Sequence, residues 1–422
     1  MVRKVVLTNG LRIILVPEPS SVASTVLILV EAGSEYETKR TNGLSHFLEH
    51  MTFKGTKNRP KPGMISHELD SLGAQSNAFT NQEYTGYWAK VQSGKFGKIL
   101  EIVSDLYLHP LFNTDEIEKE RGVIIEEINM YEDTPMRRVQ EIFTTLLYGD
   151  QPAGWDIAGR KEVIRNLSRE DFVDYRNEHY VAPKTVVVAA GNFKEGKMLR
   201  EIKTIFAHLP RRPRVHKAKT KILRMRGPAV LLKHKTSDQS HLVLGVRAFH
   251  IFDKRRFALD VLADVLGGGM SSRLFRKIRE ELGAAYYIRA GADLYLDHGY
   301  FEVSSGVDHL KIEKVIDAIL GEFRRVCDEP VGREELQKSK DHLAGNLLLS
   351  LESADELASF YGGQEILTRA MRTPKQVIQK IQRVTSGEVQ RVARALFRPR
   401  ELNLAIIGPY KHAGHFKKRL TL

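Results

Sequence analysis

The chain has 422 residues, of which 42% are hydrophobic and 28% are charged, and one of them is a cysteine, Cys327. This length exceeds one ordinary hydrophobic core and predicts two domains, and the composition excludes wholesale disorder. A single cysteine excludes an intramolecular disulfide and a cluster of thiolate metal ligands, and the formal charge of +13 is spread over short basic groups without interleaved aromatic residues, so we expect no nucleic-acid partner.

The first twenty residues, MVRKVVLTNGLRIILVPEPS, predict a strand, a turn and a second strand. Polar Thr8, Asn9 and Gly10 interrupt the apolar run early, which argues against a signal peptide. No window of the sequence approaches the apolar span that a membrane helix needs. We therefore expect neither export by a cleaved signal nor a membrane partner, and a cytoplasmic location.

Residues 43–51, GLSHFLEHM, predict a short amphipathic helix. His46 and His50 are four residues apart, so their imidazoles lie on one face and can bind one metal ion. Glu49 lies near the same edge and can reach a water bound there without being a ligand. The alternative is two histidines on an ordinary helix, hydrogen-bonded or solvated.

A second helix is predicted over residues 117–133, IEKERGVIIEEINMYED. Glu120 and Glu127 are seven residues apart, so they fall close to the same face after two turns. A catalytic zinc site usually has three protein ligands and an open position, and here the third ligand must be His, Asp or Glu. One of the two glutamates could bind the metal while the other holds a ligand histidine.

The segment LPRRPRVHKAKTK, residues 209–221, is rich in proline and basic residues and predicts a linker that divides the chain into domains 1–212 and 213–422. A faint repeat relates the two halves. Residues 43–51 align with ALDVLADVL (258–266), which places Val261, Asp264 and Val265 opposite His46, Glu49 and His50. Glu120 and Glu127 align with Ser339 and Asn346, so the second half lacks the whole group, as one lost metal site would predict.

GLSHFLEHMTFKGT (43–56) together with ERGVIIEEI (120–128) resembles the pitrilysin and insulinase family of inverted-motif zinc peptidases, and in particular the branch of the mitochondrial processing peptidase. The resemblance covers essentially the whole chain. It implies an α+β fold with two homologous domains, each a mainly antiparallel β-sheet packed with α-helices. It also implies one Zn²⁺ per chain, bound by His46, His50 and Glu127, with Glu126 as the fallback ligand and Glu120 as the supporting acid.

LGAQSNAFTNQEYTGYW (72–88) resembles the family's strand beside the metal, whose edge pairs with substrate backbone. Asn77, Ala78 and Phe79 are the matching positions. The resemblance therefore implies that peptides or unfolded polypeptide segments bind there as an added strand.

GGGMSSRLFRKIREELGAAYYI (267–288) resembles the family's second-half motif, in which an arginine and a tyrosine reach the substrate carbonyl. Arg279 and Tyr286 match, and Tyr287 is the alternative to Tyr286. Because one chain carries both motifs, a homodimer is the simpler expectation. The implied function is a zinc endopeptidase in which Glu49 activates a zinc-bound water, and the alternative is an inactive scaffold subunit of the same fold.

Overall fold

The computed structural model describes residues 2–222 and 225–422, which form two compact units. Unit 1 comprises residues 1–129, 156–218 and 348–372, and unit 2 comprises residues 130–155, 219–347 and 373–422. Each unit is a sheet with helices packed on its faces. Unit 1 therefore includes one helical segment from the second half of the chain, residues 348–372, and unit 2 includes one from the first half, residues 130–155.

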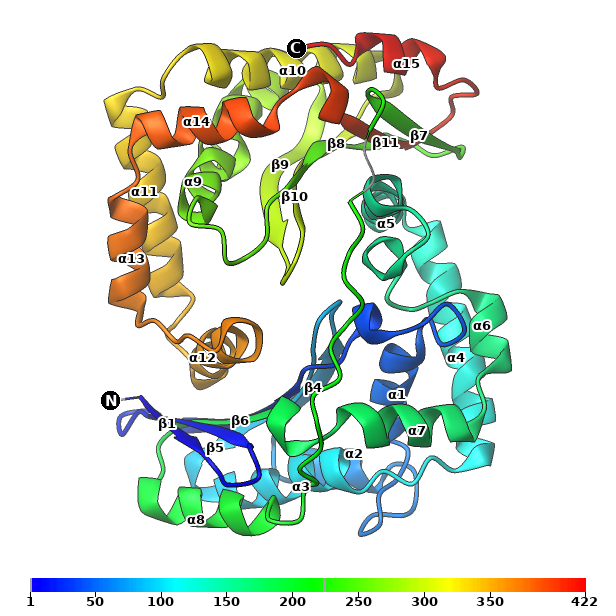
Figure 1. Cartoon of the computed structure of the whole chain (residues 1–422), viewed down its shortest axis with the longest axis vertical. Coiled ribbons are helices and arrows are strands. Elements are labelled where there is room, and N and C mark those ends of the chain that lie inside the picture. The colour runs from blue at the N-terminus through cyan, green and yellow to red at the C-terminus, as the bar shows by residue number, and fades with distance from the viewer. Residues whose placement is uncertain (1, 223–224) are drawn as a thin grey trace. The chain divides into compact units, whose positions relative to one another are not determined.

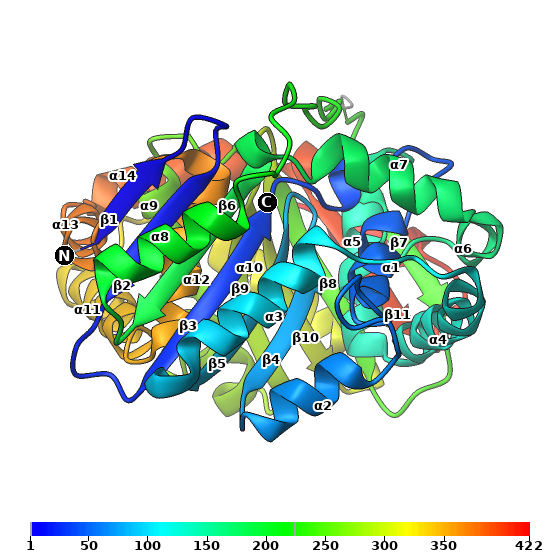
Figure 2. The same cartoon turned by 90° about the horizontal axis from the view of Figure 1, so that it is seen from below.

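The sheet of unit 1 has six described strands in the order β1-β2-β6-β3-β5-β4 (Figure 2). They are β1 (Arg3–Val6), β2 (Arg12–Pro17), β3 (Ala23–Val30), β4 (Gln75–Thr80), β5 (Thr85–Gln92) and β6 (Thr185–Gly191). Neighbours are antiparallel except β2 and β6. The predicted strand, turn and strand are confirmed, because β1 pairs with β2 across a turn in which Gly10 has a φ of 95°.

Helices cover both faces of this sheet, since β2, β3 and β6 are apolar on both faces. Figure 2 shows α3 (Phe96–Leu108) and α8 (Glu195–Ile205) on one face. The other face packs on α12 (Ala354–Thr368), which contributes Ala358 and Tyr361 to an apolar cluster with Leu27 and Val188. The remaining helices are α1 (Leu44–Thr52), α2 (Met64–Ser71), α4 (Thr114–Asp133, continuing into unit 2), α6 (Lys161–Asn166) and α7 (Arg169–His179).

The sheet of unit 2 has the order β7-β11-β8-β10-β9. Its strands are β7 (Ala229–His234), β8 (Ser240–Ala248), β9 (Ala285–Leu294), β10 (Gly299–Val307) and β11 (Asn403–Gly408). Its helices are α5 (Pro135–Tyr148), α9 (Arg256–Gly267), α10 (Ile312–Asp328), α11 (Arg333–Leu349), α13 (Pro374–Gln382), α14 (Ser386–Leu396), α15 (Gly414–Arg419) and a π-helical segment (Phe275–Glu281). Helix α5 packs on one face, against β8 and β11.

The two units repeat one α+β plan, as the sequence predicts. In each, a parallel pair joins two strands that are far apart in the chain, and the other neighbours are antiparallel. The units differ from the contiguous division at residue 212, because α5 of the first half belongs to unit 2 and α12 of the second half belongs to unit 1 (Figure 1). Each of these helices covers an apolar face of the sheet that the other half of the chain forms.

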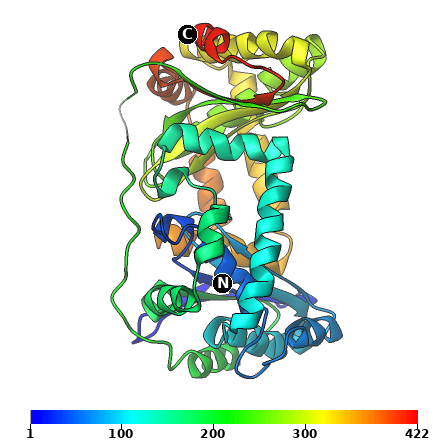
Figure 3. The same ribbon diagram turned by 90° about the vertical axis from the view of Figure 1, so that its right-hand side faces the viewer.

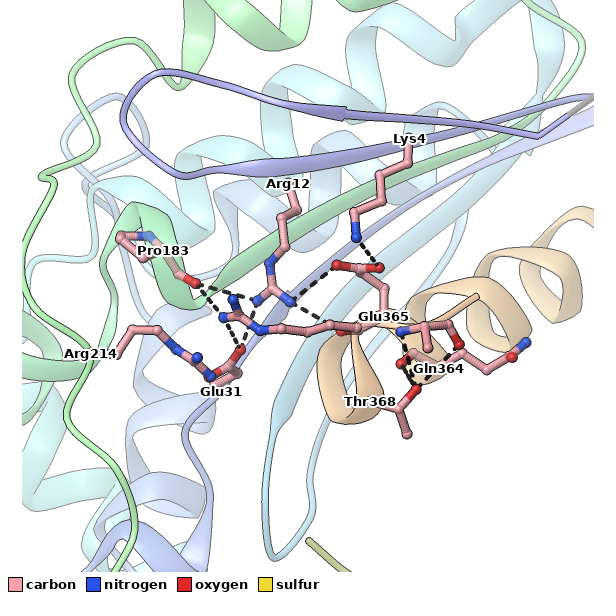
Figure 4. Close-up of polar contacts among 10 residues, drawn as sticks. Lys4, Arg12, Glu31, Pro183, Arg214, Gln364, Glu365 and Thr368 are labelled. Carbon is pink, nitrogen blue, oxygen red and sulfur yellow. Dashed lines mark hydrogen bonds and ion pairs between the residues drawn. The ribbon is translucent and has the colours of Figure 1, made fainter. Parts of the chain in front are cut away.

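Buried ion pairs bind α12 to unit 1 (Figure 4). Arg12 contacts Glu31 at 2.8 Å and donates to the backbone carbonyl of Glu365 at 3.0 Å. Lys4 pairs with the Glu365 carboxylate at 2.8 Å. Because the side chains of Glu365, Arg12 and Glu31 are at most 6% exposed, these contacts fix α12 with little competition from water.

Residues 209–222, which include the predicted linker, form no helix or strand and run as an extended trace (green in Figure 3). Arg214 pairs with Glu31, and Lys217 pairs with Glu35 at 2.6 Å, so residues 209–218 are held against the rest of unit 1 by ion pairs. Within the described residues, no helix combines the length and the apolar character that crossing a membrane requires.

Candidate metal centre

Helix α1 begins at a buried carboxylate. The backbone N–H groups of Gly43 and Ser45 both donate to Glu37 at 2.7 Å, and Asn42 Nδ2 donates to it at 3.2 Å. These bonds satisfy N–H groups that a helix start leaves unpaired. Gly43 has a φ of 95°, and a Cβ there would meet the carbonyl oxygen of Ala158 at 2.7 Å, so this position requires glycine.

The apolar side of α1 fixes its rotation. Leu44, Phe47, Leu48 and Met51 are at most 1% exposed. His46 and His50 are consequently presented together toward α4, with ring centroids 4.7 Å apart. The amphipathic helix that the sequence predicts is confirmed, and its histidines share one face.

His46, His50 and Glu127 each offer one ligand atom within 4.8 Å of the others. Nε2 of His46 lies 3.7 Å from Oε1 of Glu127, and Nε2 of His50 lies 3.5 Å from Oε2. Tetrahedral zinc with bonds of about 2.0–2.1 Å places neighbouring ligand atoms roughly 3.3–3.5 Å apart. Two imidazole nitrogens and one carboxylate, gathered within 4.8 Å of one another, are a donor set that suits a zinc ion.

Glu127 contacts the histidines, and its neighbour Glu126 does not. Glu126 is exposed and accepts a hydrogen bond from Asn129 at 3.2 Å. Glu120 lies two turns before Glu127, as the sequence predicts, and its Oε1 lies 2.9 Å from Nδ1 of His50. Of the two acids left open by the sequence, Glu127 therefore faces the Nε2 atoms and Glu120 orients His50 from behind.

Lys54 completes the surroundings of Glu120, since its Nζ lies 2.5 Å from Oε2. Burial alone would raise the pKa of Glu120, but hydrogen bonds with His50 and Lys54 hold it below its ordinary value. Burial opposes the charge on His50, whereas the hydrogen bond to Glu120 and the charges of Glu49 and Glu127 raise its pKa above the ordinary value. The same carboxylates make this face attractive to a metal cation.

Glu49 is 8% exposed and lies on the β4 side of α1, where the hydroxyl of Thr80 donates to its Oε2 at 2.5 Å. Burial raises the pKa of Glu49, although the Thr80 hydrogen bond acts in the opposite direction. A carboxylate with a raised pKa is a better proton acceptor than an exposed one. Thr80 also fixes the direction in which this carboxylate points.

Strand β4 forms the edge of the unit 1 sheet and pairs only with β5 among the described strands. It contains Asn77, Ala78 and Phe79, the positions predicted to bind substrate. Asn77 is exposed, and its Oδ1 accepts from the N–H of Ala78 at 2.9 Å. This edge strand ends at Thr80, the partner of Glu49, and an edge strand can pair with an extended peptide.

Arg279 and Tyr286 lie together in unit 2. Nη1 of Arg279 donates to the carbonyl oxygen of Tyr286 at 2.5 Å, and the guanidinium lies 5.3 Å from the tyrosine ring centroid. Tyr286 is 73% exposed, whereas Tyr287 is hydrogen-bonded to Nδ1 of His241 at 3.1 Å and burial raises its pKa to about 12. Tyr286 is thus the tyrosine available to a ligand, and its role toward substrate stays a prediction.

Unit 2 keeps the same helix pair without the metal group. Val261 and Val265, at the positions of the histidines, are at most 1% exposed. Asp264, at the position of Glu49, lies 2.6 Å from Nδ1 of His342 on α11. An apolar pair therefore serves the fold at these positions, which supports the view that the histidines of α1 are there for chemistry.

Sequence reasoning missed three contacts of this site: Glu37 at the start of α1, Thr80 on Glu49, and Lys54 on Glu120. Lys54 lies two residues beyond the end of α1, and its nearness to His50 in the sequence is a signal that could have indicated it. Glu37 and Thr80 carry no such signal, because tertiary packing alone brings them to α1.

Two family models match the chain. The model for insulinase (peptidase family M16) matches residues 12–161, and the model for the peptidase M16 inactive domain matches residues 166–343. The chain is similar to the uncharacterized zinc protease YmxG of Bacillus subtilis, with 32% identity over 413 residues, covering 97% of this chain and 98% of the relative. It is also 33% identical over 419 residues to the uncharacterized zinc protease SCO5738 of Streptomyces coelicolor, covering 97% and 90%.

Among solved structures, a protease from Helicobacter pylori superposes with a TM-score of 0.91 at 23% identity, covering 97% of this chain and 99% of the other. A peptidase M16 inactive domain from Pseudomonas fluorescens gives a TM-score of 0.88 at 17% identity, covering 97% and 98%. Both likenesses concern the duplicated α+β fold.

Proposed function

The chain belongs to the insulinase family of peptidases, peptidase family M16, and from this premise we propose that it is a zinc-dependent endopeptidase acting on peptides or on extended segments of unfolded proteins. The observation that carries the proposal is the convergence of His46, His50 and Glu127 at zinc-ligand distances beside the buried carboxylate of Glu49. The names of its relatives as zinc proteases agree with it.

In this proposal, His46, His50 and Glu127 hold one Zn²⁺ per chain, and Glu120 keeps His50 oriented through its Nδ1. The ion, when bound, supplies a Lewis acid to the scissile carbonyl and to the attacking water. Glu49 accepts the proton of that water and passes it to the leaving amine, while Thr80 holds the carboxylate in place. Burial of Glu49 suits it to this exchange of one proton.

The edge of β4 suits a substrate bound as an added strand, because backbone pairing gives affinity with loose sequence preference. Arg279 and Tyr286 are proposed to stabilise the oxyanion that forms on the substrate carbonyl. The chain carries both this pair and the metal group, so a homodimer of complete chains is the proposed assembly. A scaffold role is less favoured, since such a role requires none of the acids and histidines gathered on α1 and α4.

The test is the Glu49→Gln variant. Because glutamine cannot take a proton from water, turnover of a quenched fluorescent peptide should fall by roughly 10²- to 10⁴-fold, while zinc content stays near that of the parent chain. Glu126→Gln on the exposed side of α4 is the matched control and should keep both zinc and activity. Parental turnover by the Glu49→Gln protein would refute the assigned role.

A further inference from the structure

A basic pocket lies in unit 2, and none of its lining residues belongs to the metal group. It has a volume of about 310 Å³ and is formed by the start of α9, the end of α13 and one face of α14. We define it by its five cationic side chains, Lys254, Arg255, Lys380, Arg383 and Arg391. Three separate segments of the chain bring these charges together, so the cluster is not a basic run of the sequence.

One cation of this pocket is already paired with an acid, and the one acid of the lining is hydrogen-bonded at the start of α14. Arg255 forms a two-point contact with Asp253, at 3.0 and 2.7 Å. Glu388, the one acid of the lining, accepts from the N–H and the hydroxyl of Thr385 at 2.8 and 2.9 Å, which caps α14. Because the Thr385 groups are neutral, Glu388 keeps its negative charge and offsets part of the charge of Arg391. Five cationic side chains against this one acid still leave the lining with an excess of positive charge.

The remaining cations lack such partners. Across residues 2–222 and 225–422, the side chains of Lys254, Lys380 and Arg383 form no hydrogen bond or ion pair with a protein group, and Arg391 has only the capped Glu388 nearby. Like charges around one concave site repel one another, and the repulsion is relieved when an anion enters. The repulsion therefore destabilises the free chain, and a bound anion removes this destabilisation.

The backbone groups around the pocket are largely engaged within the chain. Helix α9 starts here, but the backbone N–H groups of Arg255 and Arg256 already donate to Asp253, at 2.8 and 3.3 Å. At the end of α13, the carbonyl of Gln382 is taken by Lys340 at 3.1 Å, so one of the acceptors that would repel an anion is occupied. Guanidinium groups match phosphate oxygens in a two-point contact, so the side chains and not the helix start provide the attraction for an anion.

The floor of the basic pocket is apolar. Phe257 and Ala258 of α9 and Val384 and Val392 near or on α14 line it, and three of these four belong to the buried core of unit 2. Inorganic phosphate would leave this floor in contact with water. An organic group attached to the phosphate would cover it, and the volume is at the lower end of the range for small-molecule sites.

We propose that the basic pocket binds a small phosphate monoester that carries an apolar or aromatic group. The phosphate lies among Lys380, Arg383 and Arg391, and the organic group lies on Phe257 and the two valines. This site is independent of the peptidase reaction, because no residue of the metal group contributes to it.

The test is calorimetric titration of the full-length protein with phenyl phosphate. We expect saturable binding to one site, weaker binding of inorganic phosphate, and none of phenol. Affinity should decrease severalfold on raising the salt to about 0.15 M, since the contacts are partly exposed. Lys380→Ala and Arg383→Ala should each raise Kd by roughly tenfold or more, and thermal melts of both variants should match the parent.

Lys375→Ala is the matched control, because this substitution removes one positive charge from α13, as Lys380→Ala does. Lys375 is exposed and does not line the pocket. It should leave Kd within about twofold of the parent. Zinc can bind phosphate by itself, so the titration is repeated after zinc removal, and the affinity should be unchanged. The proposal is overturned if binding disappears with zinc, if the pocket variants bind like Lys375→Ala, or if a hexaglutamate peptide binds more tightly than phenyl phosphate.

Discussion

At the scale of single residues, the site depends on acids that never touch the proposed metal. Glu120 is 5% exposed and bridges Nδ1 of His50 and Nζ of Lys54. It fixes the tautomer of His50, so that Nε2 stays available as a ligand atom. Loss of the contact between Glu120 and His50 should weaken zinc binding without changing which residues are the ligands.

Glu120→Gln should therefore lower zinc affinity by about 10- to 100-fold, because the amide is a weaker partner for His50 and for Lys54. Competition with a chromogenic chelator measures the effect. Glu118→Gln, on the same helix with a side chain 61% exposed, is the control and should bind zinc like the parent. Equal affinity of the two variants would show that Glu120 does not support His50.

Glu37 gives the site a pH dependence through stability. Burial raises its pKa to about 7, against the pull of hydrogen bonds from Ser45, Gly43 and Asn42. Since the folded-state pKa lies above the unfolded value near 4.5, its contribution to stability is complete below about pH 4.5 and is lost as the pH rises through 7.

The free energy of unfolding should consequently fall between pH 5 and pH 7, by up to the order of 3 kcal/mol from this one group. Urea unfolding at a series of pH values measures the slope. Glu37→Gln cannot titrate, so its slope over this window should be flatter than that of the parent chain. Parallel slopes would mean that Glu37 does not titrate there.

The residues of the metal group could be predicted from spacing, since His46 and His50 are i and i+4 and the two acids of α4 are seven apart. The choice between Glu126 and Glu127 rested on resemblance and is answered by geometry, in which Glu127 faces both Nε2 atoms. Thr80 and Glu37 could not be predicted, because their contacts with α1 depend on the path of β4 and of the loop before the helix.

At the scale of elements, α12 is held by charge as well as by apolar packing. Its Glu365 is fully buried and receives both Arg12 and Lys4 (Figure 4). Removal of one member of a buried pair leaves its partner without compensation, which costs more than the pair itself contributes. The network therefore makes the position of α12 sensitive to a single carboxylate.

Glu365→Ala should reduce the free energy of unfolding by about 3 kcal/mol, as measured by urea denaturation. Glu195→Ala is the matched control, because it removes an exposed partner of Arg3 and should cost less than about 1 kcal/mol. A similar small cost for both variants would show that the buried network adds little to the packing of α12.

The strands and helices of each half could be predicted, because alternation and helical periodicity are local signals. The repeat of the two halves extends to β6 and β11, each buried throughout and each paired in parallel with one neighbour. The faces that α5 and α12 cover were not predictable, since an amphipathic helix shows that it packs but not on which sheet.

At the scale of the whole molecule, the exchange of α5 and α12 couples the two halves of the chain. The sheet of unit 1 needs α12 to cover Leu27 and Val188, and the sheet of unit 2 needs α5 to cover Val243 and Ala405. A chain cut at the linker would leave both apolar faces open to water.

A fragment of residues 1–212 alone should thus lack a cooperative unfolding transition, and so should residues 213–422 alone. Coexpression of the two fragments should restore a cooperative transition, because α5 and α12 can then pack on their sheets. Circular dichroism during heating gives the transition, and size-exclusion chromatography shows association. A sharp transition of residues 1–212 by themselves would contradict the coupling.

The central claim is that α1 and α4 form a working zinc site, and one paired measurement tests it most directly. Elemental analysis of the purified chain is combined with cleavage of a quenched fluorescent peptide before chelation, after chelation and after zinc is restored. The account predicts close to one zinc per chain, with cleavage that is lost on chelation and recovered with zinc. A chain that takes up no zinc, or that cleaves the peptide equally well without it, would contradict the claim.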